Sequence, residues 1–438
     1  MLPPGVRAAL DYSEQYNALH YRTMIEIITV GDELTSGSTP DENACFIARA
    51  LYAAGFETAR ITTVGDAIED IRGALTGLIP STRFVVITGG LGPTDDDRTA
   101  RAAARAFGRR LQENREALLA LEDRYRSFGR PVPACAARQA RLPRGCRIIP
   151  NPVGTASGFL IEENGRSYFF LPGVPEEVRV MVEPFVVEQV KRSSGSRQVI
   201  CNRTLKVFGL GETAIRERLD GALPGQDEVS LAFYPRYPEV SLRITAKGSD
   251  EALLNRRLDD CRAVLHDRIG DFIYADTDTP LEAVVGGLLQ QSGATLAVAE
   301  SCTGGLITHR LTNISGSSAY LDRSFVVYSN RAKTDMLGVP PDMLERNGAV
   351  SEPVARCMAE GARSASGARF GLAVTGIAGP GGGSGDKPVG TVFIGVSGPA
   401  GTRVTRHLFP GTRQQIKLMS AQTALSRLRE ALLKSLRR

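Results

Sequence analysis

The sequence has no tryptophan and few histidines among its 438 residues. The four histidines are His20, His266, His309 and His407, and none stands at metal-ligand spacing from another. The seven cysteines are an odd number and form no CxxC pair. These absences disfavour histidine-based catalysis, structural zinc and a disulfide framework, and they favour reduced thiols.

Long apolar runs and a strong charge of one sign are also missing. No stretch approaches the roughly 20 apolar residues that span a bilayer, and the N-terminus lacks the pattern of a secretory signal. The net charge is +5, with Lys and Arg interspersed among Asp and Glu. The chain offers no basic stripe for nucleic acid. We therefore expect a cytoplasmic protein with no membrane association and no nucleic-acid partner.

The length and the pattern of the chain predict several domains, because 438 residues exceed what one core usually organises. Residues 1–23 are mixed in character and are treated as an extension. From residue 24, β-branched runs alternate with helical patterns. Strands are expected over 25–30, 57–64, 84–88 and 168–171, and helices over 43–54, from 95–97 onward and over 175–191. This alternation predicts a domain over 24–192 with a parallel sheet covered on both faces.

Two polar stretches, 192–197 and 276–280, read as linkers. Between them, 198–275 predicts a small α+β module with a strand at 239–245 and a helix at 250–268. From 281 to 435 the strand–helix rhythm returns, with strands near 294–299, 324–328, 370–375 and 390–396 and a last helix from about 412. The predicted fold class is α/β, with two three-layer α/β domains joined by the α+β module.

The segment with the clearest chemistry is 299–305, Ala-Glu-Ser-Cys-Thr-Gly-Gly, between a strand and the amphipathic run 306–311. A strand–turn–helix elbow of this kind exposes one side chain at the carboxyl edge of a sheet, beside the N–H groups of the first helical turn. Ser301 stands at the nucleophile position. Helix capping by Ser301 or Thr303 is the alternative.

A serine nucleophile needs a base, and no histidine is placed to serve. The strand at 325–328 ends in Tyr328, with Lys333 close behind. A desolvated lysine can accept a proton directly or through a tyrosine hydroxyl, so the two form a candidate activating pair. An exposed lysine beside a core tyrosine is the alternative. Cys302 is a rival nucleophile, although without a nearby histidine it reads as a small buried side chain.

A glycine-rich loop over 375–390 follows another strand. Backbone N–H groups around Gly376 and Gly379, together with Lys387, could hold a substrate phosphate, or the loop could be a simple connection.

Five segments together resemble the C-terminal domain of the CinA family over about 281–435. They are 299–305, 316–319, 328–330, 348–353 and 376–380. The resemblance implies deamidation of nicotinamide mononucleotide by Ser301, activated by Tyr328 and Lys333. The expected route is an acyl-enzyme formed without a cofactor. Backbone N–H groups at Thr303, Gly304 and Gly305 would hold the oxyanion, with Cys302 beside them.

The N-terminal part carries polar and glycine residues at strand ends, where ligands of open α/β sheets collect. We expect a nucleotide site formed by Asn43, Gly89, Gly90, Gly92, Thr94 and Gly154. Carboxylates of Asp32, Asp96 and Asp97 could bind a divalent metal ion. For 95–97, a favourable interaction with a helix N-terminus is an equal alternative.

These features, with 151–156 and 171–176, are similar to the CinA N-terminal domain, a relative of the MoaB/MogA molybdopterin-binding fold. The similarity implies ADP-ribose pyrophosphatase activity, although 38–42 and Arg98 depart from the usual pattern. The module at 198–275 resembles the family's KH-like region but lacks a GxxG clamp at 207–212, so a homodimer contact or domain orientation is expected of it. Other possible functions are a competence or recombination accessory protein and a molybdopterin-handling protein.

Overall fold

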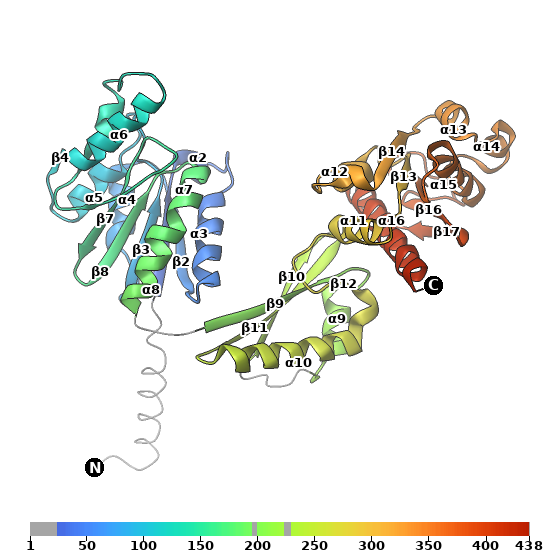
Figure 1. Cartoon of the computed structure of the whole chain (residues 1–438), viewed down its shortest axis with the longest axis horizontal. Coiled ribbons are helices and arrows are strands. Elements are labelled where there is room, and N and C mark those ends of the chain that lie inside the picture. The colour runs from blue at the N-terminus through green and yellow to red at the C-terminus, as the bar shows by residue number, and fades with distance from the viewer. Residues whose placement is uncertain (1–23, 195–198, 223–228, 438) are drawn as a thin grey trace, which may run out of the picture. The chain divides into compact units, whose positions relative to one another are not determined.

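The computed structural model describes residues 24–194, 199–222 and 229–437 (Figure 1). The chain divides into two compact units. The first holds the chain up to Ile200 together with Lys247–Glu251, and the second holds Cys201–Ala246 and Ala252–Arg438. The predicted extension 1–23 lies outside the described residues. No helix in the described ranges is long and apolar enough to cross a membrane.

The first unit contains a six-stranded sheet in the order β2-β1-β3-β8-β7-β6. Its strands are β1 (Met24–Val30), β2 (Thr58–Val64), β3 (Thr82–Thr88), β6 (Arg147–Ile149), β7 (Gly158–Glu163) and β8 (Arg166–Leu171). The first four in sheet order are parallel, but β7 runs antiparallel to β8 and β6 antiparallel to β7. The expected all-parallel sheet is therefore wrong at one edge. There a tight hairpin turns at Asn164 and Gly165, both with positive φ.

Helices cover both faces of this sheet. They are α2 (Asp32–Thr35), α3 (Glu42–Ala53), α4 (Ile68–Thr76), α5 (Thr99–Ala106), α6 (Arg115–Ser127), α7 (Pro175–Met181), the π-helical η2 (Val182–Val187) and α8 (Glu188–Ser194). The short η1 (Ala136–Ala140) and the pair β4 (Leu111–Glu113) and β5 (Arg141–Pro143) complete the unit. Alternate residues of β1 belong to two different cores, Ile25 and Ile27 to one and Ile28 and Val30 to the other. The predicted three-layer arrangement follows from this alternation.

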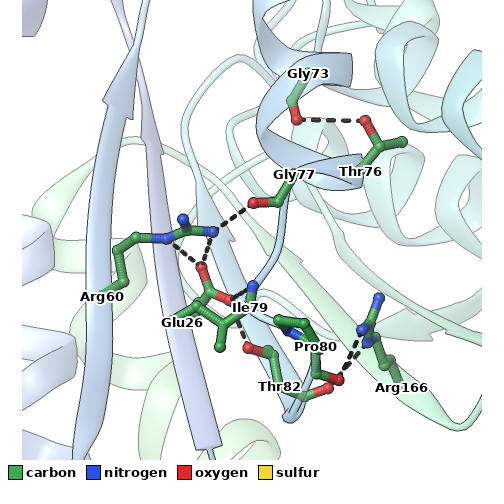
Figure 2. Close-up of polar contacts among 9 residues, drawn as sticks. All are labelled: Glu26, Arg60, Gly73, Thr76, Gly77, Ile79, Pro80, Thr82 and Arg166. Carbon is green, nitrogen blue, oxygen red and sulfur yellow. Dashed lines mark hydrogen bonds and ion pairs between the residues drawn. The ribbon is translucent and has the colours of Figure 1, made fainter.

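One charged residue is buried in the sheet of the first unit. Glu26, near the start of β1, is 1% exposed and pairs with Arg60 of β2 at 2.6 Å. Its other oxygen accepts hydrogen bonds from the Ile79 amide (2.8 Å) and the Thr82 hydroxyl (2.5 Å). Figure 2 shows these contacts, with Arg60 also reaching the Gly77 carbonyl. These partners lie on β2, on β3 and in the connection between α4 and β3, so Glu26 holds that connection against the sheet.

The second unit begins with a four-stranded sheet in the order β10-β11-β9-β12. Its elements are β9 (Val199–Val207), α9 (Glu212–Leu219), β10 (Val229–Arg236), β11 (Glu239–Gly248), α10 (Glu251–Ile269), η3 (Gly270–Phe272) and β12 (Ile273–Ala275). Tyr274 of β12 is buried in the core of the domain that follows, and Phe208 packs against that core. The Tyr274 hydroxyl and the Gln422 amide both donate to Glu239, at 2.6 and 3.0 Å. This module and the following domain therefore share packed and polar contacts.

The C-terminal domain has a five-stranded sheet in the order β14-β13-β15-β16-β17. Its strands are β13 (Leu296–Glu300), β14 (Leu321–Val326), β15 (Phe370–Gly376), β16 (Thr391–Gly398) and β17 (Gly401–Leu408). Strand β13 pairs in parallel with β14 and β15, whereas β16 is antiparallel to both β15 and β17. The last strand was not expected from the sequence.

Helices again lie on both faces, which completes a three-layer domain. They are α11 (Leu281–Gln291), α12 (Leu306–Thr312), α13 (Asn330–Leu337), α14 (Pro341–Asn347), α15 (Glu352–Ser366) and α16 (Arg413–Leu436), with the short η4 (Ser317–Ala319). One core joins α11, α12 and α16 to the sheet, and the other joins α13 and α15 to the opposite face.

Candidate active site

The elbow after β13 has the expected form. Strand β13 lies between β14 and β15, and the Ser301 amide donates to the Val374 carbonyl at 3.0 Å. The chain then turns through Gly304 and Gly305, whose φ values of 63° and 93° favour glycine. Helix α12 begins directly afterwards, at Leu306. Ser301 therefore lies at the carboxyl edge of the sheet.

The residue before the nucleophile, Glu300, is fully buried and occupies the start of α12. Its carboxylate accepts hydrogen bonds from the amides of Gly305 (3.0 Å), Ile307 (3.1 Å) and Thr308 (2.9 Å), and from the Thr308 hydroxyl (2.8 Å). A carboxylate at this place satisfies amides that the helix leaves without partners. Sequence reasoning missed this role, although an acidic residue next to a helix start is a usable signal.

The position of Glu300 changes which amides can hold an oxyanion. The Gly305 N–H is bound to Glu300, and the Gly304 N–H donates to the Ser301 carbonyl at 3.1 Å. The prediction that these two amides face a substrate is therefore wrong. In the described part of the chain no backbone carbonyl accepts from the amides of Cys302 and Thr303, so these are the candidate donors of the turn.

Lys333 of α13 reaches Ser301 from the sheet face that α13 and α15 cover. Its side chain is 1% exposed, and its Nζ lies 3.3 Å from Ser301 Oγ, 2.9 Å from the Val327 carbonyl oxygen and 3.2 Å from the Tyr328 carbonyl oxygen. No carboxylate within the described ranges forms an ion pair with it. Burial without a counter-ion lowers the pKa of Lys333.

The three contacts of Lys333 fit either protonation state of the amine, because a charged ammonium has three N–H groups for the three oxygens. A neutral Nζ has two N–H groups and one lone pair. In the neutral state the two carbonyl oxygens would accept the two N–H groups, and the lone pair would accept the Ser301 hydroxyl proton; in the charged state Lys333 donates to Ser301 instead. The alternative of an exposed lysine does not hold, because the side chain is buried.

Cys302 is a poor nucleophile in this environment. Burial raises the pKa of its thiol to about 12, with the Glu300 carboxylate adding to the rise. The thiol therefore stays protonated near neutral pH, and only the thiolate attacks efficiently. Of the two adjacent candidates, the structure favours Ser301.

Tyr328 lies at the rim of the site, with its side chain 63% exposed. Its hydroxyl oxygen accepts a hydrogen bond from Arg413 at 3.0 Å. None of the hydrogen bonds of the described residues joins that hydroxyl to Ser301 or Lys333. Arg413 also donates to the Gly379 carbonyl at 2.6 Å. Nothing in the local sequence indicates Arg413, since it lies at the start of the last helix, far along the chain from the elbow.

The glycine-rich loop joins β15 to β16 near this rim. A side chain at Gly379 would come within 2.6 Å of Val389, and one at Gly376 within 2.7 Å of Val392, so packing alone requires both glycines. The Lys387 ammonium donates to the Asn347 carbonyl at 2.7 Å. Phosphate binding by these three residues stays a prediction.

The first unit contains a cavity of about 650 Å³ at the carboxyl ends of β1 and β3. Six of the residues expected to bind nucleotide or metal line it, namely Asn43, Gly89, Gly90, Gly92, Asp96 and Asp97. The other three, Asp32, Thr94 and Gly154, are not in its lining. Most of the predicted site is thus gathered around one cavity.

The three predicted metal-binding aspartates do not converge. Both Asp97 oxygens are taken by the loop, one by the Gly92 amide (2.7 Å) and the other by the amide and hydroxyl of Thr94 (2.8 and 2.6 Å). Asp32 instead exchanges hydrogen bonds with Asp66, each accepting the other's amide N–H, at 3.0 and 2.8 Å. Across residues 24–194, 199–222 and 229–437, no three His, Cys, Asp or Glu side chains are grouped to hold a metal.

Two further details of this region differ from expectation. Helix α5 begins at Thr99 and not at 95–97, because Asp97 is bound within the preceding loop. Asp66, which the sequence did not indicate, lines the cavity. Desolvation, and after it the nearby carboxylates of Asp32, Glu33 and Asp96, raise the pKa of Asp66, while the hydrogen bond from the Asp32 amide opposes the rise.

Three known domain families match successive parts of the chain. A probable molybdopterin binding domain matches residues 26–192, the damage-inducible protein CinA KH domain matches 202–275, and the CinA C-terminal domain matches 278–432. A CinA-like protein from Geobacter metallireducens is 45% identical over 407 residues, covering 93% of this chain and 98% of that relative. The chain belongs to the CinA family.

Other members are similar over the same length. A CinA-like protein from Gemmatimonas aurantiaca is 42% identical over 410 residues, and the match covers 93% of this chain and 96% of that relative. Among solved structures, the competence/damage inducible protein CihA from Agrobacterium tumefaciens is 46% identical, with a TM-score of 0.34. It covers 35% of this chain and 93% of its own.

Proposed function

We propose that the C-terminal domain is an amidohydrolase that converts nicotinamide mononucleotide to nicotinate mononucleotide and ammonia. The observation that carries the proposal is the 3.3 Å contact between Ser301 Oγ and the buried Nζ of Lys333, which has no counter-ion in the described part of the chain. A serine beside a base of lowered pKa is the arrangement that nucleophilic acyl transfer needs. The resemblance to the CinA C-terminal domain supplies the substrate class.

The chemistry follows from the groups around Ser301. Neutral Lys333 takes the hydroxyl proton as Oγ attacks the carboxamide carbon. The amides of Cys302 and Thr303 stabilise the oxyanion. Protonated Lys333 then gives its proton to the departing nitrogen, the C–N bond breaks and ammonia leaves. Water, deprotonated by Lys333, attacks the acyl-enzyme, which releases the carboxylate and restores Ser301.

The test is ammonia release from nicotinamide mononucleotide by the wild type and by Ser301→Ala, Lys333→Ala and Cys302→Ala variants, each checked for folding by circular dichroism. We expect the first two variants to lose activity. Cys302→Ala should retain most of it, because its thiol is not the nucleophile. A folded wild type that releases no ammonia would overturn the proposal.

A second activity is proposed for the first unit, namely metal-dependent hydrolysis of ADP-ribose. The specific support is the 650 Å³ cavity, which is lined by Asp66 and Asp96 as well as by glycines that allow close approach of a phosphate. Magnesium sites commonly use one or two protein carboxylates together with substrate phosphates, so three converging aspartates are not required.

This second activity is tested by following AMP formation from ADP-ribose with magnesium and with a chelator. Loss on chelation and in Asp66→Asn, with ammonia release unchanged, would support it. A pterin that competes with ADP-ribose would instead favour molybdopterin handling. Sedimentation velocity with and without DNA tests the predicted homodimer and the predicted absence of a nucleic-acid partner. A protein partner retained through purification would favour the accessory role.

A further inference from the structure

One guanidinium, that of Arg413, connects two segments beside the Ser301 site. Arg413, the first residue of α16, donates to the Tyr328 hydroxyl at 3.0 Å and to the Gly379 carbonyl at 2.6 Å. These contacts link the end of β14, the glycine-rich loop and α16. The guanidinium has five N–H groups, and the two contacts leave the others without a protein partner among the described residues. Arg413 is an exposed residue, so these groups are accessible.

A second free cation lies one helical turn further on. Lys417 shares a face of α16 with Arg413, because residues four apart in a helix are neighbours. Its Nζ is 3.7 Å from the position that a Cβ atom on Gly304 would occupy, which places it beside the elbow. Neither Arg413 nor Lys417 forms an ion pair with a carboxylate in the described ranges. Arg413 is exposed and Lys417 is half-buried, and these two positive charges lie beside the elbow and the glycine-rich loop with no ion pair in the described ranges.

We propose that Arg413 and Lys417 bind the phosphate group of the substrate and that Tyr328 is a positioning residue, held by Arg413, and not a proton carrier. The inference rests on the proposed function, because it assumes that the amide reacts at Ser301. A guanidinium can bind phosphate through two parallel N–H groups, and a lysine adds a point charge. Lys387, which the sequence favoured for this role, is already held by the Asn347 carbonyl.

The role given to Tyr328 follows from its contacts. Its phenol oxygen receives the Arg413 hydrogen bond, and its exposed ring stands beside the backbone carbonyl that holds Lys333. Lys333 reaches Ser301 directly, so proton transfer needs no intermediate. The ring instead limits where a planar substrate can lie at the rim.

The experiment compares nicotinamide mononucleotide with its dephosphorylated nucleoside as substrates. In Arg413→Gln and Lys417→Gln, we expect KM for the mononucleotide to rise about 10- to 100-fold, the size of a lost charge-assisted hydrogen bond. The change in kcat should stay within a few-fold, and KM for the nucleoside should change much less. Arg331→Gln is the matched control, since Arg331 is an exposed arginine on α13 that pairs with Asp335. Equal losses for both substrates would overturn the phosphate subsite.

Tyr328→Phe separates positioning from proton transfer. We expect a KM increase of a few-fold, an unchanged dependence of turnover on pH, and a larger KM increase in Tyr328→Ala, which Phe partly rescues. A loss of turnover by about two orders of magnitude or more in Tyr328→Phe, with KM unchanged, would show that the hydroxyl carries a proton and would overturn this part.

The failure of the proposed function would look different. If the folded wild type releases no ammonia, calorimetric titration of nicotinamide mononucleotide and its nucleoside into the wild type and into Arg413→Gln still tests the subsite. A loss of affinity confined to the phosphorylated compound supports the subsite. Failure of the wild type to prefer the phosphorylated compound, or equal binding by both proteins, overturns it.

Discussion

The two α/β domains place polar residues at the carboxyl edges of their sheets but treat them differently. In the C-terminal domain, the amino group of Lys333 is buried with only carbonyl oxygens and Ser301 as hydrogen-bond partners. In the first unit, Asp97 has both oxygens bound by its own loop, and Asp32 is paired with Asp66. A buried lysine without a counter-ion is unfavourable for folding and is therefore the stronger sign of function. Carboxylates whose oxygens already accept hydrogen bonds from the protein can be explained by a structural role in the loop as readily as by a role in binding.

Replacing Lys333 by Met gives the largest expected effect. The change keeps an unbranched side chain of similar length and removes the base, so ammonia release should fall about 10²- to 10⁴-fold. Because the lysine has no counter-ion, the free energy of unfolding should stay the same or rise. Activity assays and chemical denaturation measure the two effects. A strongly destabilised Met variant would mean that Lys333 is chiefly structural, and the contrast between the domains would disappear.

The pH dependence gives the next effect. Only neutral Lys333 can accept the serine proton, so kcat should rise with pH through a lowered pKa and level off below the ordinary value of 10.5. Between the two pKa values the unfolded chain binds more protons than the folded one, so stability should also rise with pH in that window. Lys333→Met should lose this component of the stability profile. Identical stability profiles in the two proteins would argue against a perturbed lysine.

Glu300→Gln tests the hydrogen bonds that hold the start of α12 next to Ser301. The variant keeps the shape but puts an NH₂ group where an oxygen accepts backbone hydrogen bonds, so we expect a loss of about 2 kcal/mol in the free energy of unfolding. Activity should fall as well, because the elbow loses its anchor. Thr308→Val removes the hydroxyl contacts to Glu300 and Ser324 but leaves the carboxylate and its backbone hydrogen bonds, so this matched control should cost less. Equal stability in wild type and Glu300→Gln would contradict this account.

Asp97→Asn should give the smallest effect. One of the loop amides would lose its acceptor, at a cost of about 1 kcal/mol in the free energy of unfolding. Ammonia release should not change, since the substitution lies in the other unit. Thermal unfolding of the variant beside the wild type checks the first point and an ammonia assay the second. A fall in ammonia release would show that the two sites are coupled.

The elbow could be predicted because its signal is local. A strand, a small-residue turn and a helix follow one another within a few residues, so the order of residue types is enough to indicate Ser301. The hairpin at Asn164 and Gly165 carries an equally local signal, an Asn-Gly pair between two apolar runs, but the alternation of strands and helices hides it. The alternation of strands and helices predicts parallel pairing, and it does not predict the edge of the sheet where β7 and β8 form an antiparallel hairpin.

Other features depend on segments that meet only in the folded chain. Arg413 contacts Tyr328 and Gly379 because α16 packs beside β15 and the elbow, and no spacing in the sequence encodes that approach. The same holds for Asp66, which the end of β2 brings to Asp32. The predicted metal site failed for the opposite reason. Residues that are close in sequence need not point to the same place, and Asp97 binds its own loop.

The burial of Tyr274 in the C-terminal core has a consequence for anyone dividing the gene into expressible pieces. The polar stretch at 276–280 marks an obvious place to cut. A fragment that starts at Leu281 would lose Tyr274 and the packing of Phe208, and would leave the apolar surface around Leu281 and Val285 open to water. The linker that the sequence indicates is therefore not the boundary of the packed core. Fragments that keep the chain from residue 199 onward would preserve both.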